Sequence, residues 1–125
     1  MNQRRIAPLL ISSLLLTACA FGYQARGGLS DVAGEMRGKA YPGGSGGAHF
    51  VLSDLSGALT CEGRALPPTI APFSGSCEGE RGSGVMRCSD GRELTFEWQA
   101  LTCRSLTGKG TDAQGNRLEF RVERR

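Results

Sequence analysis

The sequence predicts a mainly β fold: a small antiparallel meander or barrel, stapled by disulfides, that follows a flexible glycine-rich tether. Residues 94–99 and 118–123 alternate strictly between apolar and polar side chains, which is the period of a half-buried strand. Glycine is abundant, at 19 of 125 residues, and runs of helix-forming residues are scarce. The length suits one small domain. Four cysteines follow residue 60, an even number that fits two disulfides in an exported chain.

Residues 1–18 have the zones of a bacterial signal peptide. Arg4 and Arg5 supply a positively charged start, and residues 6–16 form an apolar run. That run is shorter than the roughly 20 residues that a transmembrane helix needs. We therefore expect residues 1–18 to be a signal peptide and the remainder to be exported.

The signal ends in Leu16-Thr17-Ala18-Cys19, an aliphatic residue and two small residues before a cysteine. This order resembles the lipobox of bacterial lipoproteins, in which the thiol receives a diacylglyceryl group and a peptidase cuts before the cysteine. The resemblance implies lipidation of Cys19, and several acyl chains would make the membrane a stable partner. The alternative is an ordinary secretory signal in which the cysteine occurs by chance.

The residues on either side of the predicted cleavage site bear on location and charge. Ala20 stands where an aspartate would retain a lipoprotein in the inner membrane, so we expect the outer membrane, facing the periplasm. Loss of Arg4 and Arg5 leaves 13 of the 15 basic residues against 12 acidic ones, a net charge near +1. So small a charge gives no field that would attract nucleic acid.

Residues 19–47 are predicted to be the lipid anchor and a flexible tether, with the folded domain at 48–125. No sustained hydrophobic period occurs before residue 48, and residues 42–47 have the composition of a flexible linker. About 28 flexible residues would hold the domain roughly 30 Å from the lipid on average.

Within the predicted domain, apolar alternation and turn residues define the strands. The predicted strands are 49–53, 58–62, 84–88, 94–99, 101–103 and 118–123. Glycine-containing turns separate them at 89–92 and 114–116, and residues 64–76, with three prolines, are predicted to be a loop. Polar residues on the alternate positions favour an antiparallel sheet with one solvated face.

The four cysteines Cys61, Cys77, Cys88 and Cys103 allow three disulfide pairings. Three of them follow an apolar residue at a spacing of two, so on a strand Cys61, Cys88 and Cys103 would face the core. We favour Cys61–Cys88 with Cys77–Cys103, although the sequence leaves the other pairings open. A domain of this size buries little surface, and each bridge would stabilise it by about 2–4 kcal/mol.

Four short motifs lie along the predicted domain. A Cys-x-Gly, a cysteine-Ser-Asp-Gly-Arg turn, a Gly-x-Gly and a final aromatic strand lie at 61–63, 84–92, 108–110 and 115–120. With the lipobox, they are similar to those of a group of small, largely uncharacterised proteobacterial lipoproteins, over the span 61–120. The resemblance implies a β-rich domain, and it assigns no functional residues because the group has no established activity. Cys77 and Cys103 depart from that group's simpler two-cysteine pattern.

The sequence offers no convincing catalytic or metal site, so we predict a protein that is not an enzyme and needs no cofactor. His49, the single histidine, could form a triad with Ser53 and Asp54, but no nucleophile elbow is present. The cysteines could ligate zinc, but no Cys-x-x-Cys pair occurs and the periplasm favours disulfides.

Carboxylates and one aromatic residue are the remaining candidates for chemistry. Paired carboxylates could form a glycosidase site, and the candidates are Glu78, Glu80, Asp90, Glu93 and Glu97. All five fall in predicted turns or on polar strand faces, where solvated carboxylates are expected. Trp98 could be a ligand platform, but its place in a strict alternation predicts a core residue.

Two functional hypotheses follow. The first is a membrane-anchored module of the cell envelope, non-catalytic and either binding or structural, with an envelope protein or peptidoglycan as partner. The second is a periplasmic enzyme inhibitor of the lysozyme-inhibitor type, because residues 88–96 resemble the cysteine-led strand of those proteins. Only the short stretch 97–125 follows that segment, which argues against the second hypothesis.

Overall fold

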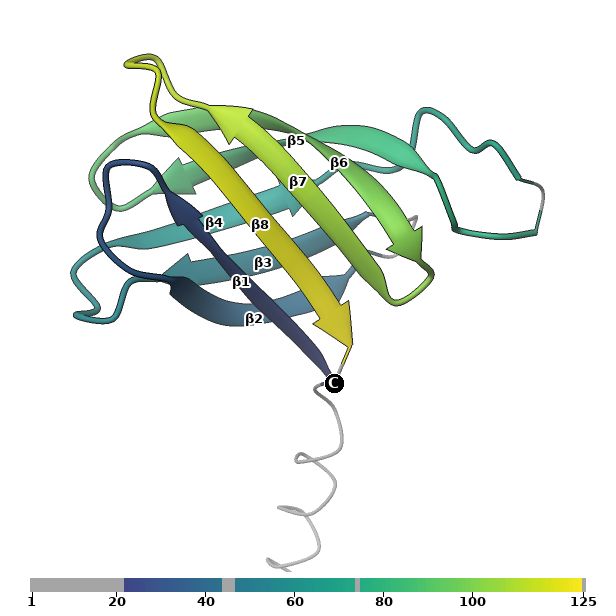
Figure 1. Cartoon of the computed structure of the whole chain (residues 1–125), viewed down its shortest axis with the longest axis horizontal. Coiled ribbons are helices and arrows are strands. Elements are labelled where there is room, and N and C mark those ends of the chain that lie inside the picture. The colour runs from purple at the N-terminus through teal and green to yellow at the C-terminus, as the bar shows by residue number, and fades with distance from the viewer. Residues whose placement is uncertain (1–21, 44–46, 74, 125) are drawn as a thin grey trace, which may run out of the picture.

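The computed structural model describes residues 22–43, 47–73 and 75–124, so the predicted signal peptide and Cys19 lie outside the described residues. Eight strands form one closed barrel in which every strand pairs antiparallel with its neighbours in sequence and β8 closes on β1 (Figure 1). The strands are β1 (Tyr23–Leu29), β2 (Met36–Pro42), β3 (Ala48–Ser53), β4 (Thr60–Ala65), β5 (Arg81–Cys88), β6 (Glu93–Thr102), β7 (Ser105–Thr111) and β8 (Arg117–Arg124). The predicted mainly β barrel with disulfides is confirmed.

The predicted tether is wrong for residues 23–42, which form β1 and β2, and the domain begins at Tyr23 rather than at residue 48. Two glycines in this segment, Gly27 and Gly38, allow close packing between strands. A Cβ on Gly27 would lie 2.8 Å from Cα and Cβ of Phe120, and a Cβ on Gly38 would overlap the backbone of Val51. These glycines therefore let β1 and β2 approach their neighbours.

Aromatic rings facing glycines fill the barrel interior. The rings of Phe50, Phe96 and Phe120 meet with centroids 4.4 to 5.8 Å apart, and all three side chains are buried. These three rings and that of Trp98 each lie opposite a glycine on a neighbouring strand, and the pairs are Phe50–Gly63, Phe96–Gly84, Trp98–Gly82 and Phe120–Gly108. A barrel of eight strands is just wide enough for its own side chains, so the missing glycine side chains provide the space for the rings.

The predicted strands agree well with the observed ones where side chains alternate. Four of them lie inside β3, β5, β6 and β8, and the alternating residues that were predicted to face inward are buried, Trp98 among them. Residues 58–62 overlap β4 only in part, because a turn stabilised by Asp54 occupies residues 54–59. Of the predicted strand 101–103, residues 101 and 102 are the end of β6 and residue 103 lies in the following turn, and β7 was not predicted.

Both disulfides have the favoured pairing. Cys61 and Cys88 are directly opposed on β4 and β5, are buried, and have Cα atoms 3.9 Å apart. Cys77 pairs with Cys103, which joins the loop 66–80 to the turn between β6 and β7. The expectation that Cys103 faces the core is wrong: it is exposed, because β6 ends at Thr102 after a register shift.

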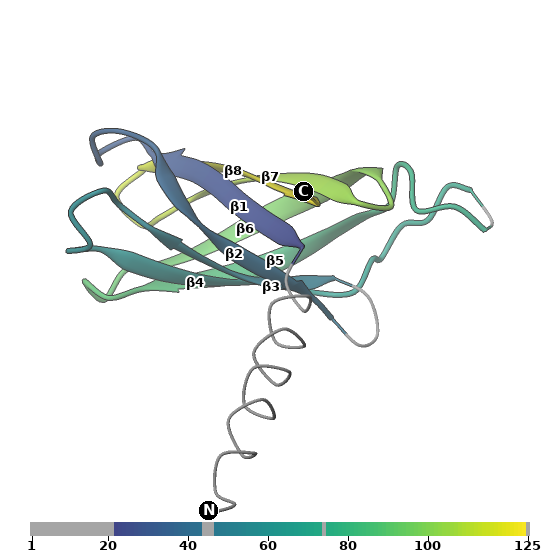
Figure 2. The same ribbon diagram turned by 90° about the horizontal axis from the view of Figure 1, so that it is seen from below.

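The two ends of the barrel differ. At the closed end, four turns at 30–35, 54–59, 89–92 and 112–116 cover the barrel (Figures 1 and 2). The opposite end, here called the open end, carries both ends of the described chain and the connections 43–47, 66–80 and 103–104. Figure 2 shows the loop 66–80 projecting beyond this end. In the described residues, no helix is long and apolar enough to cross a membrane.

Candidate functional site

The residues of the hypothetical triad do not converge. His49 lies on the outer face of β3 and its ring stacks on that of Tyr41, with centroids 6.3 Å apart. Ser53 shares a hydrogen bond of 3.1 Å with the hydroxyl of Thr60. The carboxylate of Asp54 accepts hydrogen bonds from its own turn, chiefly from the Leu59 amide, and these lower its pKa. Each of the three residues therefore has a local structural partner.

The five candidate carboxylates are also dispersed. Glu78 and Glu80 lie in the loop at the open end, whereas Asp90 lies at the closed end. Glu93 and Glu97 are on the outer face of β6, and Glu93 forms an exposed ion pair of 2.9 Å with Arg87. Across residues 22–43, 47–73 and 75–124 there is no group of three metal-ligating side chains. The four cysteines that zinc would need are consumed in disulfides.

An ion-pair network at the closed end joins three turns that are distant in sequence. The guanidinium of Arg92 donates two hydrogen bonds to Asp31, of 2.9 and 3.0 Å, and binds Asp90 at 2.9 Å. Its distance to Asp112 is 3.4 Å. The side chain of Asp112 is only 2% exposed and that of Arg92 15%. The network therefore holds the turns of the closed end together.

The pKa shifts in this network favour the charged forms of Arg92 and of its aspartate partners. The hydrogen bonds from Arg92 hold the pKa of Asp31 and of Asp90 below the usual value, and the carboxylates raise the pKa of Arg92. A hydrogen bond from the side-chain amide of Asn116 lowers the pKa of Asp112. General acid–base catalysis needs a group whose pKa lies near the working pH. Asp90, a sequence candidate, is instead held ionised as part of the closed-end network.

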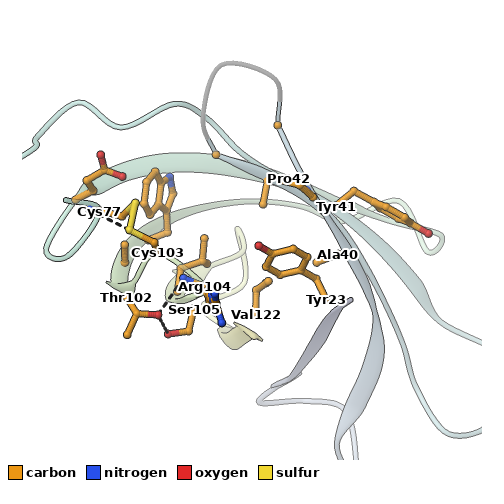
Figure 3. A pocket seen from close by; sticks show the side chains of 17 residues that line it. Tyr23, Ala40, Tyr41, Pro42, Cys77, Thr102, Cys103, Arg104, Ser105 and Val122 are labelled. Atoms are coloured by element: carbon orange, nitrogen blue, oxygen red, sulfur yellow. Dashed lines mark hydrogen bonds between the residues drawn. A yellow bond between two sulfur atoms is a disulfide. The ribbon is translucent and has the colours of Figure 1, made fainter. Parts of the chain in front are cut away.

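A small pocket of about 210 Å³ lies in the mouth of the barrel at the open end (Figure 3). In Figure 3 the disulfide Cys77–Cys103 lies on one side of the pocket and Tyr23 on the other, whereas the ring of Tyr41 points away. Trp98 lines the pocket together with small and aliphatic side chains such as Ala48, Ala100 and Leu106. The volume is below the roughly 300 Å³ at which pockets for small molecules begin.

The loop 66–80 is anchored at its base and exposed at its tip. The Trp98 indole donates a hydrogen bond of 3.1 Å to the Leu66 carbonyl, and Ile70 forms an isolated β-bridge with Arg81. The amide of Gly79 donates to the carbonyl of Ala100 near the end of β6, and the disulfide Cys77–Cys103 holds the same side. These contacts order the base of the loop and leave its outer part facing solvent.

Exposed apolar side chains concentrate at the open end. We name four of them the apolar rim: Leu66, Ile70, Phe73 and Leu101. Phe73 is 60% exposed and Ile70 55%. Large apolar side chains that are exposed together at one end of a protein indicate an interaction site. Sequence analysis missed this rim, and the one available signal was three large apolar residues inside a proline-rich loop that ends in a cysteine.

No family model, no curated protein and no solved structure matches this chain.

Proposed function

We propose that this chain is a lipid-anchored lipoprotein of the cell envelope whose barrel is a non-catalytic binding module. The observation that carries the proposal is the contrast between a barrel interior filled with apolar side chains and a rim of exposed apolar residues at one end. The lipobox that ends at Cys19 supports the anchor, and Ala20 supports the outer membrane facing the periplasm.

The distribution of polar groups favours binding over catalysis. Within the described residues, the barrel core is apolar, and the shielded Asp112 carboxylate is held in the closed-end network. The candidate carboxylates lie at opposite ends of the barrel or on its outer face, and the strongest electrostatic interactions bind the closed end together. An envelope protein or peptidoglycan is the partner class that we propose for the exposed surface of the barrel.

The anchor is tested by comparing the natural chain with the Cys19→Ser variant. We expect the natural chain in the membrane fraction and resistant to high salt, because acyl chains insert into lipid independently of charge. The variant should carry no lipid. Equal fractionation of both proteins, with no lipid label on either, would contradict the proposal.

A second candidate is an inhibitor of lysozyme type, and two observations favour it. Strands β1 to β4 precede residues 88–96, so the stretch 97–125 has to supply only the rest of β6 together with β7 and β8 to close the barrel. The loop 66–80 projects as a cross-linked segment, and a pre-ordered loop loses less conformational entropy when it enters a cleft. Lysozyme activity measured with micromolar protein tests this candidate, and undiminished activity would reject it.

A further inference from the structure

The start of β1 limits how far the barrel can lie from a lipid on Cys19. Tyr23 follows Cys19 by four positions, and four extended residues span at most about 14 Å. Tyr23 lines the pocket in the mouth of the barrel. A lipid on Cys19 therefore holds the open end close to the bilayer, and the closed end lies farther away.

The end that is held near the bilayer is also the end with the apolar rim. Phe73 and Ile70 are the most exposed large apolar residues there, and both belong to the loop that projects beyond the barrel. Outside the open end, the described residues expose Leu55 in a closed-end turn and Val85 on the side of β5. The apolar rim therefore lies at the same end of the barrel as the proposed lipid anchor.

Charge at the open end is nearly balanced. Among the described residues, its strand ends and connections carry four arginines and three glutamates: Arg64, Arg81, Arg104, Arg124, Glu78, Glu80 and Glu123. A surface that binds lipid by electrostatics needs several unpaired basic residues near the membrane. Contact at this end must therefore depend on apolar side chains, with little preference for anionic lipid.

We propose that the open end of the barrel rests on the phospholipid bilayer and that Ile70 and Phe73 enter its headgroup region. This inference rests on the proposed lipid anchor, because the anchor supplies the high local concentration at which a small apolar contact suffices. The barrel then has a fixed orientation, with its closed end and outer strand faces directed into the periplasm toward any further partner.

Orientation is tested in the lipidated protein reconstituted into phosphatidylcholine vesicles that contain brominated lipid. We compare Phe73→Trp with the matched control Leu55→Trp, after subtracting the fluorescence of Trp98, the one natural tryptophan. Bromine quenches only tryptophan that reaches the lipid. The fluorescence at position 73 should be strongly quenched and that at position 55 unaffected.

Affinity is tested with the mature chain from Ala20, secreted without lipid so that both disulfides form. Its partition onto phosphatidylcholine vesicles should fall at least about tenfold in the Ile70→Ser, Phe73→Ser variant, because two large apolar side chains lose their contact. The Leu55→Ser, Val85→Ser control should partition as the parent does. Adding phosphatidylglycerol should change the partition less than about threefold, since the charges nearly balance.

The outcomes separate this inference from the proposed function. If the native protein carries no lipid, the proposed function fails. If it carries lipid but position 73 is no better quenched than position 55, the open end does not lie on the bilayer and only this inference is overturned. Recovery of a protein by a photo-crosslinker at position 73, with no quenching there, would likewise overturn it in favour of a protein partner.

Discussion

Replacing Gly63 by alanine should drive the new methyl group into the ring of Phe50. A Cβ at this position would lie within 2.7 Å of three ring atoms, well inside ordinary van der Waals contact. The ring cannot easily move, because it is fully buried and packs on Phe120 with centroids 4.4 Å apart. Overpacking of this kind costs about 1–3 kcal/mol. We expect the Gly63→Ala variant to lose at least about 2 kcal/mol of unfolding free energy.

A double-mutant cycle isolates this clash. Phe50→Leu alone should destabilise the protein, since it removes buried aromatic contacts. In the Phe50→Leu background the methyl group of Gly63→Ala occupies vacated space, so its additional cost should fall by about 1 kcal/mol or more. The assay is guanidinium unfolding with both disulfides intact. Gly28→Ala is the matched control: its Cβ would meet only the Gly34 carbonyl oxygen, at 3.9 Å, and should change stability by less than about 0.5 kcal/mol.

Strict additivity of the two substitutions would refute the claim that inward glycines make room for aromatic rings. A neutral Gly63→Ala variant would refute it as well. Either result would mean that the strand can move away from the ring at little cost, contrary to the dense packing seen in the barrel.

Three further predictions concern the closed end and the two disulfides. The aspartates that Arg92 binds have lowered pKa values, so their contribution to stability is present above about pH 4 and is lost as the pH falls through their folded pKa values. Arg92→Met should therefore lower the melting temperature at pH 7 and flatten its fall between pH 4 and pH 2; parallel melting profiles would contradict this. Replacing Cys61 and Cys88 by alanine should cost about 3–4 kcal/mol, from a loop closed over 27 residues, measured by denaturant unfolding. Cys77 and Cys103 close a loop of similar length, 26 residues, but their loss lets residues 66–80 detach while the barrel stays folded, so replacing them should cost less and chiefly speed hydrogen exchange in that loop; equal global losses would argue against a locally tethered loop.

The sequence predicted the strands whose inward positions carry large side chains and missed those whose inward positions carry small ones. Alternation is plain in β6 and β8, where phenylalanine, leucine and tryptophan face the core. In β7 the inward positions include Gly108, and β1 contains Gly27 where it packs on Phe120. A glycine that faces a ring on the next strand has no hydrophobic signal of its own. Its role depends on the register between strands, which the local sequence does not contain.

The features considered for the candidate site also depend on contacts between residues that are distant in sequence. The favoured cysteine pairing is correct, but the sequence left the other two pairings open, because the pairing depends on which strands lie side by side. The contacts of Arg92 were not predictable, since Asp31 is 61 residues away and Asp112 is 20 residues away. The apolar rim depends on which end of the barrel the loop 66–80 occupies, and that required the positions of β1 and β2.

The intact mass of the native protein from membranes, with and without reductant, tests the central claim most directly. We predict a mass that corresponds to the chain from Cys19 onward plus acyl chains, which rises by the mass of about four hydrogens when two disulfides are reduced. An unlipidated mass would contradict the anchor and with it the orientation at the bilayer. A mass unchanged by reductant would contradict the cross-linked barrel.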